Sequence, residues 1–359
     1  MKVVITGGGT GGHLFPGIAV ADEIVRRHPG AEVLFIGSGR QLDLTALSPR
    51  NYQTAAIPCQ GLKGMTWGRK LVTLCQLPLS VVAAIRLLRR FRPELVFGVG
   101  GYVTGPVVLA AKLLRIKTCI HEQNSVPGLA NRWLAKIADR VFLSIPGSES
   151  YFPAGKWTLS GNPVRRELLT LAEQTREKPT GSALVLLVLG GSQGAHRLNR
   201  LASAAVIEKR ATLPPGLRII HQTGVKDEAL VRAAYEQAGI KAEVAAFFHD
   251  MGRVYAQADL VVSRAGATTL AELAVLGKPS ILVPFPYAAD DHQRKNAQFL
   301  VASGAARMYA ESELSPELLA AALAELLPYQ ALRQEMGWAA RRQATPRAVE
   351  TIVDNCWLS

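Results

Sequence analysis

Cysteine is scarce in this sequence, and its four cysteines follow no pattern. Cys59, Cys75, Cys119 and Cys356 lie far apart, and no pair has the Cys-x-x-Cys spacing of a metal site or a redox motif. Secreted proteins, in contrast, commonly carry paired cysteines that form disulfides. We therefore expect no disulfide framework but a reduced, cytoplasmic protein whose cysteines are small buried side chains.

The sequence also lacks a long apolar run. A helix that crosses a bilayer needs about 20 consecutive apolar residues. The best stretch, residues 71–88, is interrupted by Gln76, Pro78 and Arg86. The apolar run after Lys2 is shorter than the ~7–15 residues at the centre of a signal peptide. We expect neither a membrane-spanning helix nor a signal peptide.

Acidic residues are few relative to basic ones. There are 28 Asp and Glu against 41 Lys and Arg, which gives a net charge of +13. This imbalance favours a polyanionic partner: nucleic acid, an anionic membrane or a phosphorylated substrate. Aromatic residues make up only 6% of the chain, are not interleaved with the basic ones and form no recognised nucleic-acid-binding module. We expect no nucleic acid partner, and composition leaves the other two open.

What the sequence does contain is a regular alternation of short apolar runs with helical patterns. Such alternation predicts parallel sheets covered by helices on both faces, and 359 residues are enough for two such domains. The strands expected in the first half are residues 2–6, 32–36, 94–98, 118–121 and 140–144, with helices at 15–27, 106–114 and 129–138. The strands expected in the second half are residues 183–189, 218–222, 243–246, 260–263 and 280–284.

A glycine and a proline within residues 161–163 interrupt this alternation and mark the expected domain boundary. We assign residues 1–162 to an N-terminal domain and residues 163–340 to a C-terminal domain. Residues 170–182 are polar and are expected to form a surface loop, while a last helix, 341–359, is expected to pack back on the first domain. Ligands of doubly wound sheets bind beyond the carboxyl ends of the strands, so we expect the site in the cleft between the domains.

Glycine-rich turns follow four of the expected strands. Residues 7–13 satisfy the Gly-x-Gly-x-x-Gly fingerprint, but the second strand ends without the acidic residue that binds the ribose of a nicotinamide cofactor, which argues against a dehydrogenase. Similar turns lie at residues 100–106, 190–195 and 263–269. Glycine lets the backbone approach a ligand, and a helix N-terminus attracts anions, so the four turns indicate a phosphorylated ligand.

The turns belong to six motifs that occur in order along residues 8–296. They are Gly8-Gly9-Thr10-Gly11-Gly12-His13, Gly100-Gly101-Tyr102-Val103-Thr104-Gly105-Pro106, His121-Glu122-Gln123-Asn124, Gly161-Asn162-Pro163-Val164-Arg165, Gly190-Gly191-Ser192-Gln193-Gly194-Ala195 and Gly266-Ala267-Thr268-Thr269-Leu270-Ala271-Glu272. This set resembles the bacterial family of transferases that add N-acetylglucosamine to undecaprenyl-pyrophosphoryl-N-acetylmuramoyl-pentapeptide (lipid I). Their product, lipid II, is the precursor of peptidoglycan. The resemblance covers most of the chain.

The resemblance implies an α/β protein of the GT-B fold, with two doubly wound Rossmann-like domains and a cleft between them. It implies an inverting transfer from UDP-N-acetylglucosamine to lipid I, with residues 1–162 on the acceptor and membrane side and residues 163–340 binding the donor. It also implies that neither a cofactor nor a metal is required. The sequence has no Asp-x-Asp triplet, and we interpret the adjacent Asp290 and Asp291 as part of a solvated loop.

The resemblance also assigns roles to single residues. His13 is the candidate base that takes the proton of the acceptor hydroxyl, a task that suits a histidine. Tyr102, His121 and Glu122 are placed on the acceptor side, where the last two either form a second acid/base pair or shape the pocket. Residues 286–291 depart from the family pattern, which leaves the role of His292 open.

Donor binding is assigned to residues of both halves. Glu272 is expected to bind the ribose hydroxyls, the backbone of Phe248 the uracil, and Gln293 the sugar. The full set is Thr10, Gly11, Gly12, Asn124, Arg165, Ser192, Phe248, Ala267, Thr268, Thr269, Leu270, Ala271, Glu272 and Gln293.

A lipid acceptor requires contact with a bilayer surface. Apolar residues recur at helical spacing among basic ones near residues 71–92, which suits a helix on anionic lipid; the alternative is a core helix with a solvated basic face. Pro78 is expected to break this helix. We expect a peripheral protein on the cytoplasmic face of the inner membrane, with cell-wall or cell-division proteins as further partners. The patch residues are Leu79, Val82, Ile85, Arg86, Arg89 and Arg90.

Three other functions stay open on the sequence. The first is another GT-B transferase with a lipid acceptor, such as a diacylglycerol glycosyltransferase. The second is a UDP-N-acetylglucosamine 2-epimerase, and the third is a non-catalytic subunit that binds a nucleotide sugar. The intact His13 and the acceptor-side motifs disfavour the third.

Overall fold

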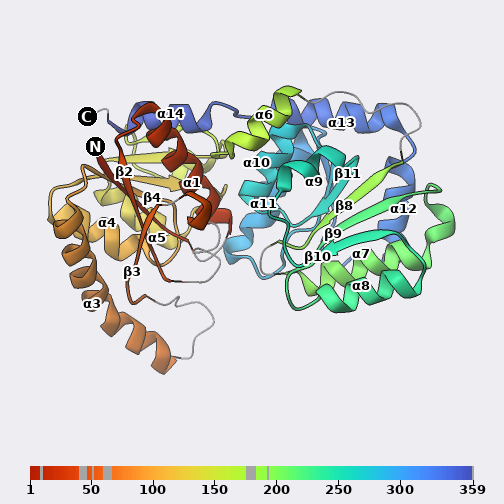
Figure 1. Cartoon of the computed structure of the whole chain (residues 1–359), viewed down its shortest axis with the longest axis horizontal. Coiled ribbons are helices and arrows are strands. Elements are labelled where there is room, and N and C mark those ends of the chain that lie inside the picture. The colour runs from red at the N-terminus through yellow and green to blue at the C-terminus, as the bar shows by residue number, and fades with distance from the viewer. Residues whose placement is uncertain are drawn as a thin grey trace. The chain divides into compact units, whose positions relative to one another are not determined.

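The computed structural model describes residues 1–8, 11–39, 47–50, 52–59, 67–174, 183–191 and 194–357, without the side chains of residues 49 and 67–76. The chain divides into two compact units, which we call unit 1 (Met1–Arg165 with Thr345–Ser359) and unit 2 (Arg166–Ala344). Each unit is built on its own parallel sheet (Figure 1).

The sheet of unit 1 has seven parallel strands among the described residues, in the order β3-β2-β1-β4-β5-β6-β7. Successive residues of a strand point to opposite faces, and both faces are apolar here. Val3 and Ile5 belong to the core on one face, together with Ile18 and Ile352, whereas Val4 belongs to the core on the other. The strands are β1 (Lys2–Thr6), β2 (Glu32–Gly37), β3 (Gln53–Ala56), β4 (Leu95–Gly98), β5 (Lys117–Glu122), β6 (Arg140–Leu143) and β7 (Trp157–Leu159).

Helices cover both faces of this sheet (Figure 1). The helices α3 (Trp67–Phe91), α4 (Thr104–Leu113) and α5 (Leu129–Ile137) contribute to the core that contains Val4. The helices α1 (Gly11–Arg27) and α14 (Ala348–Cys356) contribute to the core that contains Val3.

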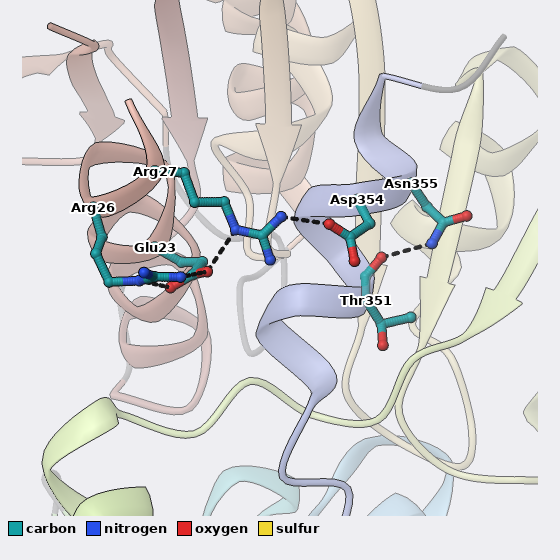
Figure 2. Close-up of polar contacts among 6 residues, drawn as sticks. All are labelled: Glu23, Arg26, Arg27, Thr351, Asp354 and Asn355. Atoms are coloured by element: carbon teal, nitrogen blue, oxygen red, sulfur yellow. Dashed lines mark hydrogen bonds and ion pairs between the residues drawn. The ribbon is translucent and has the colours of Figure 1, made fainter. Parts of the chain in front are cut away.

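Helix α14 returns to unit 1 from the far end of the sequence and packs along α1. Its Ile352 and Cys356 are fully buried. Figure 2 shows the polar contacts beside this seam: Glu23 accepts from Arg26 and from Arg27 Nε, each at 2.6 Å, and Arg27 also pairs with Asp354. Apolar burial with an ion-pair network at its edge therefore holds the last helix on the first unit.

Unit 2 repeats the plan with six parallel strands, in the order β10-β9-β8-β11-β12-β13 among the described residues. The helix ends have local causes: Ser315 caps α12 by accepting from Leu318 N, and Asp250 caps α9 by accepting from Arg253 N. The strands are β8 (Val185–Leu189), β9 (Arg218–Gln222), β10 (Ala242–Ala245), β11 (Leu260–Ser263), β12 (Ser280–Leu282) and β13 (Ala306–Met308). The helices are α6 (Arg166–Gln174), α7 (His196–Glu208), α8 (Glu228–Gln237), α9 (Met251–Gln257), α10 (Ala267–Leu276), α11 (His292–Ala302), α12 (Pro316–Leu326) and α13 (Gln330–Arg342).

Three local expectations differ from the structure. Helix α3 runs unbroken through Pro78, because the proline removes one backbone hydrogen bond while the following turns pack on α4. Residues 170–174 continue helix α6, which buries Leu168 against its neighbours; the rest of the expected loop, residues 175–182, lies outside the described residues. The last helix begins at Ala348 rather than near residue 341, since α13 ends at Arg342 and Pro346 intervenes.

Candidate functional site

The strand order of unit 1 reverses between β1 and β4, and ligands of open α/β sheets bind beyond the carboxyl ends of strands at such a point. These two strands pair in parallel with Thr6 opposite Gly98. The turns that follow them therefore emerge side by side. A β-carbon on Gly7 would lie 2.4 Å from Val99 Cγ2, so this approach of the two turns requires glycine.

His13 is the third residue of α1 and stands beside both turns. Its Nδ1 lies 3.2 Å from Gln123 Oε1. A β-carbon on Gly100, whose φ is +92°, would lie 3.0 Å from Cε1 and from Nδ1 of the ring. The imidazole is therefore packed against bare backbone, with its Nδ1 edge turned to Gln123.

Glu122 is 2% exposed and organises the turn after β5. Its Oε1 accepts from the backbone N–H and the side-chain amide of Asn124, at 3.0 and 3.1 Å. Its Oε2 accepts from Gly128 N at 3.2 Å and from Asn131 Nδ2 at 2.8 Å. Burial raises the pKa of the Glu122 carboxyl, and these hydrogen bonds oppose the shift.

His121 is fully buried beside this turn. Burial lowers its pKa to about 4, so the ring is neutral near pH 7. Its Nε2 lies 3.2 Å from Gly161 O and 2.9 Å from Ser144 Oγ.

Two more of the expected residues lie in unit 1. Tyr102 is half exposed, and its backbone oxygen accepts from the Cys59 thiol. Arg165 is buried, and its guanidinium lies over the Phe15 ring with Cζ 4.6 Å from the centroid. Gly11 and Gly12 are the first two residues of α1.

Unit 2 has an equivalent point between β8 and β11, where Leu189 lies opposite Ser263. Asn199, on α7, braces the turn after β9. Its side-chain amide donates to Thr223 O at 2.8 Å and to Asp227 Oδ2 at 2.7 Å. Arg264 braces the turn after β11 by donating to Val283 O at 3.1 Å and pairing with Glu311.

Helix α10 begins directly after this turn and contains Ala267, Thr268, Thr269, Leu270, Ala271 and Glu272. Glu272 is 6% exposed, and its Oε2 accepts from the hydroxyl of the fully buried Tyr255 at 3.0 Å. The orientation of the carboxylate is therefore fixed from inside the unit.

Two other residues expected to bind the donor sugar nucleotide form hydrogen bonds within unit 2. Gln293 Oε1 accepts from Phe285 N at 2.9 Å, and Phe248 N donates to Gln222 Oε1 at 3.1 Å. His292 Nδ1 donates to Ala289 O at 2.7 Å, at the start of α11. Thr10 and Ser192 lie outside the described residues.

The expected membrane patch lies on α3. Leu79 and Val82 are 65% and 44% exposed, and Arg86, Arg89 and Arg90 are exposed with them. Ile85 is half-buried and packs against the core, as do the buried Ala84 and Leu88. One face of α3 thus packs in the core, while the apolar and basic residues on its other face lie at the surface.

Exposed apolar side chains also lie on α4, which packs on α3, and on α5, which packs on α4. Leu113 of α4, and Leu129 and Trp133 of α5, are each more than 60% exposed, and Lys136 Nζ lies 4.2 Å from the Trp133 ring centroid. Within the described part of the chain, no helix combines the length and apolar character needed to cross a bilayer.

Metal sites in proteins are built from clusters of His, Cys, Asp or Glu side chains. Among the described residues, no three His, Cys, Asp or Glu side chains lie together as a metal site requires. Asp290 and Asp291 both take left-handed backbone conformations just before α11, and both are exposed.

Sequence reasoning named most of the residues at the two ligand edges but missed those that hold them. The sequence places Gln123 in a motif but predicts no role for it. It also predicts no role for Asn199, Tyr255 or Arg264. What marks these residues is a hydrogen bond from a buried polar side chain to another segment of the chain. Such a contact is visible only in the folded structure.

Two doubly wound parallel-sheet units, each with its ligand edge at a reversal of strand order, are the architecture of the GT-B class of glycosyltransferases, which confirms the expected fold class. The sequence model of the glycosyltransferase family 28 N-terminal domain matches residues 3–143, and that of the C-terminal domain matches residues 185–352. The chain belongs to glycosyltransferase family 28.

Individual relatives cover nearly the whole chain. A protein of Desulfotalea psychrophila, named UDP-N-acetylglucosamine–N-acetylmuramyl-(pentapeptide) pyrophosphoryl-undecaprenol N-acetylglucosamine transferase, is 52% identical over 99% of this chain and 96% of its own length. The crystal structure of Acinetobacter baumannii MurG is 31% identical, with a TM-score of 0.74 and 98% of each chain covered. A UDP-GlcNAc 2-epimerase from Neisseria meningitidis, at 16% identity and a TM-score of 0.68 over 99% of each chain, shares the fold alone.

Proposed function

We propose that this chain transfers N-acetylglucosamine from UDP-N-acetylglucosamine to lipid I and thereby makes lipid II. The observation that carries the proposal is the 52% identity, over almost the whole length, to a relative named for this activity. The structure supports it by bringing His13 of the first motif beside Gln123 of the third, next to Glu122 and Asn124 of that same motif. An epimerase shares the fold at far lower identity.

The reaction needs a base, an electrophile and a leaving group. His13 takes the proton of the acceptor hydroxyl while that oxygen bonds to the anomeric carbon of the sugar. The bond from that carbon to the diphosphate breaks, and UDP leaves with the electron pair. Attack from the opposite side inverts the configuration.

The donor is assigned to unit 2. Glu272, oriented by Tyr255, is placed to accept hydrogen bonds from the two ribose hydroxyls. The N-terminus of α7, which follows the glycine turn after β8, and that of α10 supply partial positive charge toward a diphosphate. In this proposal Phe248 lies at the uracil, Gln293 at the sugar, and Arg165, Asn124, Thr10 and Ser192 near the diphosphate and the transferred sugar.

The acceptor is assigned to unit 1, with Tyr102, His121 and Glu122 on that side. His121 and Glu122 are buried and bind neighbouring backbone, which favours the view that they shape the pocket. The apolar and basic surface of α3 is proposed to rest on anionic lipid. The protein then works as a peripheral enzyme at the cytoplasmic face of the inner membrane, where cell-wall and division proteins use its product.

An acceptor panel tests the proposal. The purified protein is given UDP-N-acetylglucosamine with a lipid-I analogue, with diacylglycerol, or with no acceptor, each in the presence of a metal chelator. We expect label to enter the lipid-I analogue alone. Transfer to diacylglycerol would reassign the acceptor, and formation of UDP-N-acetylmannosamine without acceptor would identify an epimerase.

A further inference from the structure

A chain of hydrogen bonds runs from His13 into the interior of unit 1. His13 Nδ1 lies 3.2 Å from Gln123 Oε1, and Gln123 Nε2 lies 3.1 Å from His121 Nδ1. His121 Nε2 in turn lies 3.2 Å from Gly161 O. Gln123 is 2% exposed and His121 is fully buried, so both side chains are held away from bulk water.

Backbone carbonyls fix the direction of this chain. Gln123 Nε2 lies 2.8 Å from Val99 O, and a carbonyl oxygen only accepts, so the amide NH₂ must face Val99. The amide oxygen must then face His13, and the atom that donates to it is a protonated Nδ1. At the other end Gly161 O also only accepts, which places the proton of His121 on Nε2 and leaves its Nδ1 to accept from Gln123.

The electrostatics of His121 agree with this assignment. A ring that is an acceptor at Nδ1 and a donor at Nε2 must be neutral, and burial lowers the pKa of His121 to about 4. Near pH 7 the donor and acceptor roles along the chain are therefore mutually consistent.

We propose that Gln123 is a positioning residue that holds the proton of His13 on Nδ1 and so presents Nε2 as the basic nitrogen. This inference rests on the proposed function for its catalytic meaning. Without the amide oxygen, neutral imidazole would divide between its two tautomers, and only one carries the lone pair on Nε2. Gly100 also helps to set the orientation of the His13 ring, because the ring packs against this residue, which has no side chain.

The step balances as a simple base reaction. The O–H bond of the acceptor breaks, its proton bonds to Nε2, and the oxygen pair forms the new bond to the anomeric carbon. His13 becomes an imidazolium whose Nδ1–H still donates to Gln123 Oε1. Proton return to water or to the departing UDP restores the neutral ring.

The first test reads the tautomer directly, without a variant of Gln123. The protein is labelled with ¹⁵N-histidine, and long-range ¹H–¹⁵N spectra distinguish protonated from unprotonated ring nitrogens. The chain has 7 histidines, and His13 is assigned by its missing signal in His13→Asn. At a pH where the His13 ring is neutral, we expect Nδ1 to be protonated and Nε2 to be unprotonated. A proton on Nε2 instead would overturn the inference, even if transfer to lipid I is measured.

The second test is kinetic. Gln123→Met removes the acceptor, and we expect kcat to fall roughly 10–100-fold, less than the ~10²–10⁴ that a general base contributes, with the KM for each substrate changed less than about threefold. Gln123→Glu keeps the shape of the side chain but sets a carboxylate oxygen against Val99 O, which accepts from the amide NH₂ in the wild type, so we expect kcat to fall in this variant as well, whereas a purely steric role predicts no loss.

Thr118→Val is the matched control. Thr118 is buried on β5, the strand that Gln123 follows, and donates to Asp139 Oδ2 at 2.9 Å, so its loss removes a comparable hydrogen bond elsewhere. We expect kcat near wild type for this variant; an equal fall in Thr118→Val and Gln123→Met would overturn the inference. If wild type makes no lipid II but shows the Nδ1 tautomer, the proposed function fails while the tautomer assignment stands.

Discussion

At the scale of the residue, the site depends on buried side chains that hold other side chains. Glu272 is only 6% exposed, and the hydroxyl of Tyr255 fixes one of its two oxygens. A carboxylate held in one orientation can accept from two neighbouring hydroxyls without losing rotational freedom on binding. In the proposed donor site, Tyr255 thus contributes to binding although it lies wholly inside the unit.

This arrangement predicts a graded loss of donor affinity. Glu272→Ala should raise the KM for UDP-N-acetylglucosamine about 10–100-fold, since hydrogen bonds to a charged group are worth about 1.5–3 kcal/mol. Tyr255→Phe should raise it only about 2–10-fold, since the carboxylate remains and only the hydrogen bond that orients it is lost. Steady-state kinetics with both substrates varied checks this. The exposed Glu236 supplies the control, Glu236→Ala, and an equal rise in acceptor KM would contradict the assignment.

Sequence reasoning reached the motif residues because glycine turns and polar residues follow apolar strands in a regular order. It did not reach the role of Gln123, because the amide contacts His13, which lies 110 positions earlier in the chain. The contact of Tyr255 could not be predicted either. A tyrosine among the apolar residues of a short helix gives no sign in the sequence that its hydroxyl donates to a glutamate. Contacts between loops of different strands depend on the register of the sheet.

At the scale of the element, helix α3 combines two roles. Ala84 and Leu88 are fully buried in unit 1, while Leu79 and Val82 are exposed among arginines. A helix that is half core and half surface explains why sequence periodicity left both interpretations open. The structure contains features of each.

The exposed part of α3 predicts salt-dependent membrane binding. Replacing Arg89 and Arg90 by Gln should weaken binding to anionic vesicles roughly tenfold or more, at about 1 kcal/mol for each basic residue near the surface. Vesicle sedimentation at low and high salt measures it, and kcat with a water-soluble acceptor should not change.

Leu79→Glu is expected to weaken the same binding through its apolar contribution, and Leu230→Glu is its control. Leu230 is 58% exposed on α8 of unit 2, so it presents a similar side chain away from the patch. Equal losses from Leu79→Glu and Leu230→Glu, or binding that ignores salt, would show that α3 is not the membrane surface.

Most of the central strands were predicted from the sequence to within one or two residues, because both faces of these strands are apolar. The short strands β3, β7 and β13 were not predicted. The first two lie at the edges of the unit 1 sheet, and Gln53, Thr54 and Ala56 of β3 are exposed. Such strands are defined by hydrogen bonds to a neighbour rather than by an apolar run of their own.

At the scale of the whole molecule, each unit buries a neutral histidine, and this makes stability depend on pH. Burial lowers the pKa of His121 to about 4 and that of His221 to about 3. An unfolded histidine takes up its proton near pH 6.5, before the folded one does. The unfolded state therefore binds more protons below that pH, and stability falls as the pH drops from about 6.5 toward 4.

We accordingly predict that the free energy of unfolding falls by about 1 kcal/mol for each of these histidines between pH 7.5 and 5.5. Urea unfolding followed by circular dichroism at several pH values measures this loss. His221→Asn should flatten the dependence that comes from unit 2. A constant or rising stability over this range would contradict the assignment of buried, neutral rings.

The most direct measurement of the central claim is the structure of the product. Purified protein is incubated with UDP-N-acetylglucosamine and a lipid-I analogue in chelator, and the product is analysed by mass spectrometry and by the anomeric proton coupling. We predict one added N-acetylglucosamine in β linkage, inverted from the α linkage of the donor, and a kcat at least about 10²-fold lower for His13→Ala. An unmodified acceptor, or an α-linked sugar, would contradict the account.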